Sequence, residues 1–320
     1  MYEVESGVIS TVLTGSGGLS KVTSGTVTLN AANTYTGLTE VNAGRLVLGV
    51  NSALSGSTSV TVNGGELALG TTVQSVSSVV LNGGTISGGT LTGTDYLVKQ
   101  GEISTVLVGA AGLTKATIGE VRLSATNTYT GSTEVNAGRL VLGVNAALSG
   151  STAVTVSGGE LVLGSTVQSV SAVVLNDGAI LGGTLTGTDY LVKKGSVSTV
   201  LAGGAGLRKT TADEVVLSGV NTYAGATVVD AGRLVLGVNT ALPGSTALTL
   251  NGGELALGVT TQSVGTVVLN DGTISGGVLT GTDYLVKKGA VSTVLAGVAG
   301  LRKVTPDEVV LSGVNTYTGA

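Results

Sequence analysis

The sequence contains no cysteine, no histidine, no tryptophan and no phenylalanine among its 320 residues. Without cysteine there is no disulfide framework, no thiolate chemistry and no common structural zinc site. Without histidine the chain also lacks the usual general base and the usual ligand of transition metals. We therefore expect no metal and no other cofactor. The scarcity of large rings beside 54 glycines favours a narrow β-structure filled by small branched side chains.

Charge is scarce as well. Charged residues make up 11% of the chain and the net charge is −4, so we expect no nucleic acid partner. No run of 18 apolar residues exists, which predicts no membrane insertion by this segment. The first residues lack the basic start and apolar run of a signal peptide. Because both ends fall inside a repeat, we expect the chain to be a fragment of a longer array.

A unit of 94 residues recurs along the chain without insertion or deletion. Such a period is typical of solenoids, propellers and arrays, in which each unit buries its surface against the next. We expect one continuous β-solenoid over residues 1–320, with superrepeats 2–95, 96–189, 190–283 and a partial one at 284–320. The eight tyrosines mark the period in two sets, which are Tyr2, Tyr96, Tyr190 and Tyr284, and Tyr35, Tyr129, Tyr223 and Tyr317.

Each superrepeat divides into five shorter coils. Short alternating runs end at Gly or Asn, and aligning these turns gives coils 38–56, 57–76, 77–95, 96–112 and 113–131. One aligned column, expected to face inward, is Val41, Val62, Leu81, Val98 and Ala116. Another is Leu46, Leu67, Ile86, Ile103 and Val121.

These columns predict an all-β fold, a single-stranded parallel β-helix with about 17 coils of 17–20 residues. Right-handed winding is expected because parallel crossovers strongly prefer that hand. A propeller is the alternative, but antiparallel blades would need hairpin signals that the columns do not show.

Polar and charged residues also align from coil to coil. Stacked Asn side chains can hydrogen-bond along the stacking axis, and opposite charges on successive strands, about 4.8 Å apart, can pair. We expect these side chains to form structural ladders rather than catalytic, cofactor or metal sites. The residues are Asn42, Asn63, Asn82, Arg45, Glu66, Glu120, Arg139, Glu160, Asp177, Lys194, Glu214, Arg233, Glu254, Asp271 and Lys288.

The segment 18–49 runs from Gly-Leu-Ser-Lys through Asn-Thr-Tyr-Thr-Gly to Ala-Gly-Arg-Leu-Val-Leu-Gly. It resembles the passenger-associated repeat of bacterial autotransporters, and it recurs at 112–143 and 206–237, with its first half at 300–320. The resemblance implies an extracellular or outer-membrane-surface β-solenoid exported by type V secretion. In that family the repeat is associated with stalks that often carry adhesive regions. The translocator barrel of the family is not in this sequence.

Two kinds of site are weighed against a structural role. Asp95, Asp189 and Asp283 recur at 94 residues, roughly 24 Å apart at five strand spacings, too far for the paired carboxylates of a glycosidase. The tyrosines could stack on sugars, but Tyr129 aligns with Leu148, so we expect corner packing with the hydroxyl at the surface.

The predicted function is a non-enzymatic extracellular stalk or filament segment that supports adhesion. A multivalent glycan-binding adhesin is the alternative, and a β-helix carbohydrate-active enzyme is the third candidate, disfavoured because an active site is normally unique. Partners are expected to be a further copy bound end to end, or a surface glycan or protein receptor.

Overall fold

The computed structural model describes residues 1–319, which form strands and turns. The strands stack in parallel in a β-helix of about 16 turns, and the described residues contain no helix. The predicted parallel β-helix is therefore confirmed, with about one turn fewer than expected. Consistent with this, residues 1–319 include no helix long and apolar enough to cross a membrane.

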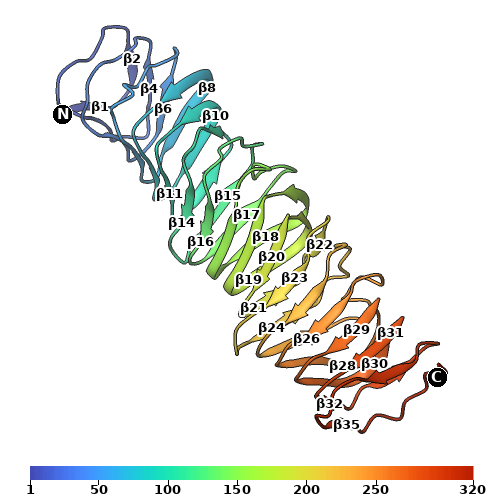
Figure 1. The fold of residues 1–320 in the computed structure, drawn as a ribbon. Helices are drawn as coiled ribbons and strands as arrows, with labels where there is room; N and C mark the ends of the chain where they lie inside the picture. The colour runs from blue at the N-terminus through green and yellow to red at the C-terminus, as the bar shows by residue number, and fades with distance from the viewer. Residues whose placement is uncertain (320) are drawn as a thin grey trace. The chain divides into compact units, whose positions relative to one another are not determined.

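The chain divides into two compact units, Met1–Ser169 and Val170–Ala320. Figure 1 shows the same construction in each unit, with short strands stacked in successive turns of the chain. Each turn contributes one strand to a first face and one to a second face, and some turns add a strand on a third face. The two faces meet at a line of tight turns, which we call the turn ridge.

In Met1–Ser169 the strands of the first face are β1 (Tyr2–Val4), β3 (Leu19–Lys21), β5 (Thr39–Val41), β7 (Val60–Val62), β9 (Val79–Leu81), β11 (Tyr96–Val98), β14 (Leu113–Lys115), β16 (Thr133–Val135) and the start of β18 (Val154–Ser169). The second face holds β2 (Gly7–Ile9), β4 (Thr26–Leu29), β6 (Arg45–Leu48), β8 (Glu66–Ser75), β10 (Thr85–Thr92), β12 (Gly101–Ile103), β15 (Glu120–Leu123), β17 (Arg139–Leu142) and the middle of β18. On the third face β13 (Val106–Val108) pairs with the end of β10, which pairs with the end of β8.

In Val170–Ala320 the first face holds the start of β19 (Ala172–Thr186), β20 (Asp189–Val192), β23 (Leu207–Lys209), β25 (Thr227–Val229), β27 (Leu248–Leu250), β29 (Thr266–Leu269), β31 (Asp283–Val286) and β34 (Leu301–Lys303). The second face holds the middle of β19, β21 (Gly195–Val197), β24 (Glu214–Leu217), β26 (Arg233–Leu236), β28 (Glu254–Ser263), β30 (Thr273–Thr280), β32 (Gly289–Val291) and β35 (Val309–Leu311). β22 (Val200–Ala202) and β33 (Val294–Ala296) pair with the ends of β19 and β30 on the third face.

The core follows from the two-residue alternation of the strands. In β7, Val60 and Val62 are fully buried while Thr61 between them is half-buried, as expected where successive side chains point to opposite faces of a sheet. Leu46 and Leu67 lie opposite each other on β6 and β8 and are also fully buried. Burying one such side chain stabilises the fold by about 1.5–3 kcal/mol. The inner ladders therefore hold the stack together.

The register differs from the aligned columns at the short coil 96–112. Ile103 pairs with Leu123, not with Val121, which lies opposite Gly101 instead. This shift of two residues keeps Leu123 inward, because side chains alternate with a period of two. On the first face Val98 pairs with Lys115 and not with the predicted Ala116. The first column is therefore not wholly aliphatic, and a lysine enters the core.

Candidate functional site

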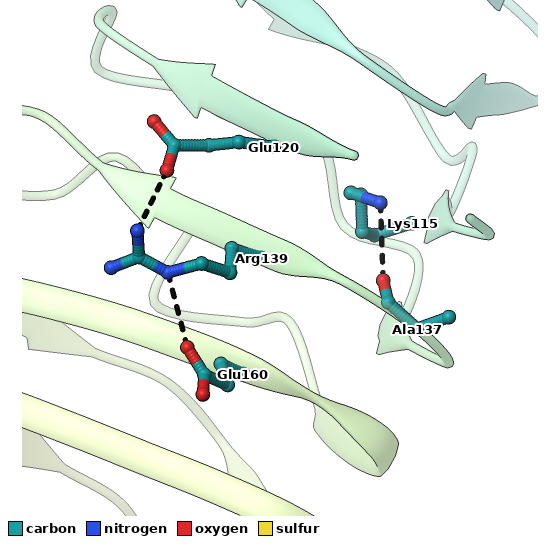
Figure 2. Close-up of polar contacts among 5 residues, drawn as sticks. All are labelled: Lys115, Glu120, Ala137, Arg139 and Glu160. Atoms are coloured by element: carbon teal, nitrogen blue, oxygen red, sulfur yellow. Dashed lines mark hydrogen bonds and ion pairs between the residues drawn. The ribbon is translucent and has the colours of Figure 1, made fainter. Parts of the chain in front are cut away.

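A charged ladder crosses three successive turns of the first unit. Arg139 extends from β17 between two glutamates, with Nη1 2.9 Å from Glu120 Oε2 and Nε 3.0 Å from Glu160 Oε2 (Figure 2). The backbone register makes this geometry, because Glu120, Arg139 and Glu160 are direct neighbours on β15, β17 and β18. All three side chains are about half exposed, so the ladder lies at the surface.

The same ladder recurs with small changes. In the second unit Arg233 lies 2.8 Å from Glu214 and 3.1 Å from Glu254. The hydrogen bond that the Arg233 guanidinium donates to Glu214 is the main reason that the pKa of Arg233 rises. Arg45 pairs with Glu66 at 3.0 Å, but its neighbour on β4 is the uncharged Thr26. The first copy therefore has one partner where the later copies have two.

A second set of ion pairs lies at the turn ridge of the second unit. Lys194 Nζ is 2.7 Å from Asp177 Oδ2, and Lys288 is 2.7 Å from Asp271. The lysine hydrogen bond and the backbone N–H of Gly178 lower the pKa of Asp177. Sequence reasoning missed two further pairs, which are Arg208 with Asp230 at 2.5 Å and Arg302 with Asp283 at 3.4 Å.

Asparagine amides form a third ladder along the turn ridge. Asn63 Nδ2 donates to Asn42 Oδ1 at 2.6 Å, and Asn82 donates to Asn63 at 2.7 Å. Asn42 donates in turn to Ser20 Oγ at 3.0 Å. In the second unit Asn270 and Asn251 repeat the arrangement and end on the carboxylate of Asp230. These amides bond to one another along the stacking direction, and the last oxygen of each run, Asn82 Oδ1 or Asn270 Oδ1, has no partner among residues 1–319.

Buried lysines were not expected. Lys21, Lys115 and Lys209 have no exposed surface, and each donates to a carbonyl oxygen two residues further along the chain, at Thr23, Thr117 and Thr211. Burial lowers the pKa of the Lys115 amine. Alternation from the inward Leu113 could have revealed them, because Lys115 lies two residues later on the same strand.

Six of the eight tyrosines are fully buried, so the expectation that their hydroxyls lie at the surface is wrong, whereas Tyr2 is exposed. The six are Tyr35, Tyr96, Tyr129, Tyr190, Tyr223 and Tyr284. Tyr129 has no exposed surface, and its hydroxyl lies 2.6 Å from Thr133 Oγ1. The hydroxyl of Tyr190 accepts from the N–H of Gly187 at 2.7 Å. The ring of Tyr129 also lies 6.3 Å from that of Tyr96. Neighbouring turns of the chain cover these rings, so the enclosed rings offer no face to a sugar.

Two more polar side chains brace the corners and were missed by sequence reasoning. Asn127 Oδ1 accepts from the N–H of Leu107 at 2.8 Å, and its Nδ2 donates to Ala147 O at 2.7 Å. Gln168 makes the corresponding bonds to Leu148 N and Val144 O. Each satisfies backbone groups that the corners leave unpaired. Their recurrence every 94 residues within apolar surroundings is the signal that could have found them.

The candidate catalytic carboxylates do not form a site. Asp95 and Asp189 are exposed, and Asp283 pairs with Arg302. Over residues 1–319 no three acidic side chains gather in a way that could hold a metal ion. A surface hollow of about 470 Å³ in the second unit is lined by Asp271, Lys288, Asp307 and Glu308 together with backbone and small side chains, and its Asp271 is already paired with Lys288.

The geometry defines a class of protein, a repetitive β-helix whose recurring polar side chains bind neighbouring turns of the same chain. The family model described as the passenger-associated-transport-repeat matches residues 19–48, 113–142 and 207–236. The chain therefore carries three repeats of autotransporter passenger domains, and the predicted resemblance is confirmed. No curated protein and no solved structure matches it significantly.

Proposed function

We propose that this chain is a non-enzymatic structural segment of a secreted or surface-displayed passenger, a stalk that carries an adhesive region away from the cell. One observation carries the proposal. The recurring charged and amide side chains bind neighbouring turns, as Arg139 does with Glu120 and Glu160. Side chains used in this way stabilise a stack and leave no convergent group for chemistry.

The mechanism is additive. Each turn contributes backbone hydrogen bonds, inward aliphatic side chains and a rung of the surface ladders, so the length of the stack scales with the number of turns. At a strand spacing of about 4.8 Å, five turns would extend it by about 24 Å. The passenger repeats support a place outside the cell, because autotransporter passengers are exported.

Length against repeat number tests this function. Chains with one, two and three copies of residues 96–189 would be compared by electron microscopy or small-angle scattering. We expect the length to grow by about 24 Å per copy. A matched control uses a Gly131→Ala copy, because a Cβ there would lie 2.4 Å from the backbone of Ala111 and Gly112 and should disrupt the added turns. Equal lengths for the intact series would refute the stalk.

A second assay distinguishes the structural stalk from binding functions. Attachment by a surface glycan or protein receptor, including multivalent glycan binding, predicts retention on a glycan array or on host cells that increases with copy number. End-to-end pairing of two copies predicts a concentration-dependent increase in mass. Turnover of a polysaccharide by the purified chain would contradict the non-enzymatic function.

A further inference from the structure

One turn in each of the superrepeats 96–189 and 190–283 combines several unfavourable features. It is the short coil that starts at Tyr96 in the first unit and at Tyr190 in the second, followed by the strand that carries the buried lysine. We call residues 101–115 and 195–209 the short-coil segments. The features are independent of the proposed function and concern how the stack opens.

The first feature is the backbone at the start of β12. Gly101 has φ +120°, and a Cβ there would lie 2.3 Å from the carbonyl oxygen of Gly84. Gly195 has φ +115° and the same close approach to Gly178. Only glycine fits such a position, and glycine loses more conformational entropy on folding than any other residue. Glycines of positive φ with similarly close backbone approaches also lie in nearby turns, at Gly84 and Gly138, so this feature alone does not distinguish the short coil.

The second feature is a buried hydroxyl that has no hydrogen bond. Thr105 and Thr199 have no exposed surface, and their Oγ1 atoms have no partner among residues 1–319. Removing a hydroxyl from water without replacing its hydrogen bonds opposes folding. Thr293, at the equivalent place in the next copy, is also buried with an unpartnered Oγ1, whereas the buried Thr133 is bonded to Tyr129.

The third feature is a buried ammonium without a counter-ion. Lys115 Nζ donates to the carbonyl oxygens of Thr117 and, at 3.1 Å, of Ala137 (Figure 2). No ion pair joins it to a carboxylate within residues 1–319, and Lys209 has the same two kinds of carbonyl partner. Carbonyl dipoles compensate only part of the cost of burying a charge. At the equivalent place the preceding turn has the aliphatic Val98.

We propose that the short-coil segments are built-in opening points, at which the stack separates locally before the turns on either side of it. The unpaired hydroxyl and the buried ammonium lie within the same 15 residues of chain, whereas strands β5 and β16 hold neither an unpaired threonine hydroxyl nor a buried lysine. Local openings with different free energies divide native proteins into cooperative blocks. Here the blocks would repeat with the superrepeat, so the chain opens in units rather than all at once.

Native-state hydrogen exchange read by mass spectrometry tests this proposal on the full chain. We expect the amides of β12 and β14 to exchange at least about tenfold faster than those of β5 and β16, which are buried strands of the first face. Thr105→Val keeps the shape and removes the unpaired hydroxyl, so it should slow exchange in residues 101–115 about tenfold. It should leave residues 195–209 unchanged.

Further variants keep the result interpretable. Lys115→Met should slow the same amides, and Thr199→Val should act only on residues 195–209. Thr114→Val is the matched control, because its half-buried side chain points outward on the same strand, and it should change nothing. Uniform exchange across all strands would overturn the proposal, and so would Thr105→Val or Thr199→Val variants that slow exchange everywhere alike. If Lys115→Met fails to fold, Thr105→Val and Thr199→Val still test the proposal.

Discussion

The buried pair of Tyr129 and Thr133 offers a sharp test of how the corners are held. The two oxygens lie 2.6 Å apart, and both side chains have no exposed surface. Tyr129→Phe leaves the threonine hydroxyl without its partner, and Thr133→Val leaves the tyrosine hydroxyl without its own. An unsatisfied buried group costs about 1–3 kcal/mol, so each single variant should lower the local free energy of opening by that amount.

The double variant distinguishes a coupled pair from two independent contacts. Replacing both partners by apolar groups of similar shape can be nearly neutral, so the double variant should lose less than the sum of the singles by about 1–2 kcal/mol. Hydrogen exchange of the β16 amides measures this locally, since repeat arrays depart from two-state unfolding. Tyr2→Phe is the control, because its exposed hydroxyl bonds Thr14 O and its loss should be almost silent. A double variant whose loss of local opening free energy equals the sum of the two single losses would refute the reasoning.

Three further outcomes follow from surface and core contacts. Arg139→Met removes two half-exposed ion pairs and should lower the free energy of unfolding by about 1 kcal/mol. Arg45→Met removes one ion pair and should lower it by less. The difference between the two variants should shrink in 1 M salt, where the screening length is about 3 Å. Ala146 has φ +52°, so Ala146→Gly should raise the free energy of unfolding, measured by thermal denaturation, by about 0.5–1 kcal/mol. The relief of left-handed strain exceeds the entropy that glycine loses on folding. Burial lowers the pKa of Lys115 from 10.5, so the folded chain binds fewer protons than the unfolded chain, and urea titrations should show stability rising as pH approaches 10.5. Burial raises the pKa of Tyr35 to about 12, which makes stability fall from about pH 10 to pH 12. Lys115→Met should reduce the rise without abolishing it, because burial also lowers the pKa of Lys21 and Lys209, and it should leave the fall unchanged.

Much of the surface geometry was predictable because the period is regular. A spacing of 19 or 21 residues on either side of Arg139 assigns Glu120 and Glu160 to adjacent strands, and the register places them there. The same argument brings Asp177 beside Lys194. Surface ladders need only the correct neighbour, and a turn of known length supplies it.

The core needed information that alignment of turn glycines does not contain. Gly101 lies opposite Val121, two residues after Gly119, so aligning the two glycines shifts the pairing by two residues. A shift of two leaves every inward residue inward, so hydrophobic alternation cannot detect it. The Tyr129 hydroxyl is buried against Thr133, a contact that depends on the packing of the folded turns and that the strand pattern does not contain.

The Asn127 side chain has a consequence for how such genes change length. It joins Leu107 in the turn before it to Ala147 in the turn after it, and Asn221 joins Leu201 to Ala241 in the same way. Unequal recombination that gains or loses a whole 94-residue unit leaves each asparagine with the same two neighbours. A gain of one residue more or fewer would misplace both contacts at the junction. Natural length variants of the gene should therefore differ by multiples of the 282 base pairs that encode one 94-residue superrepeat.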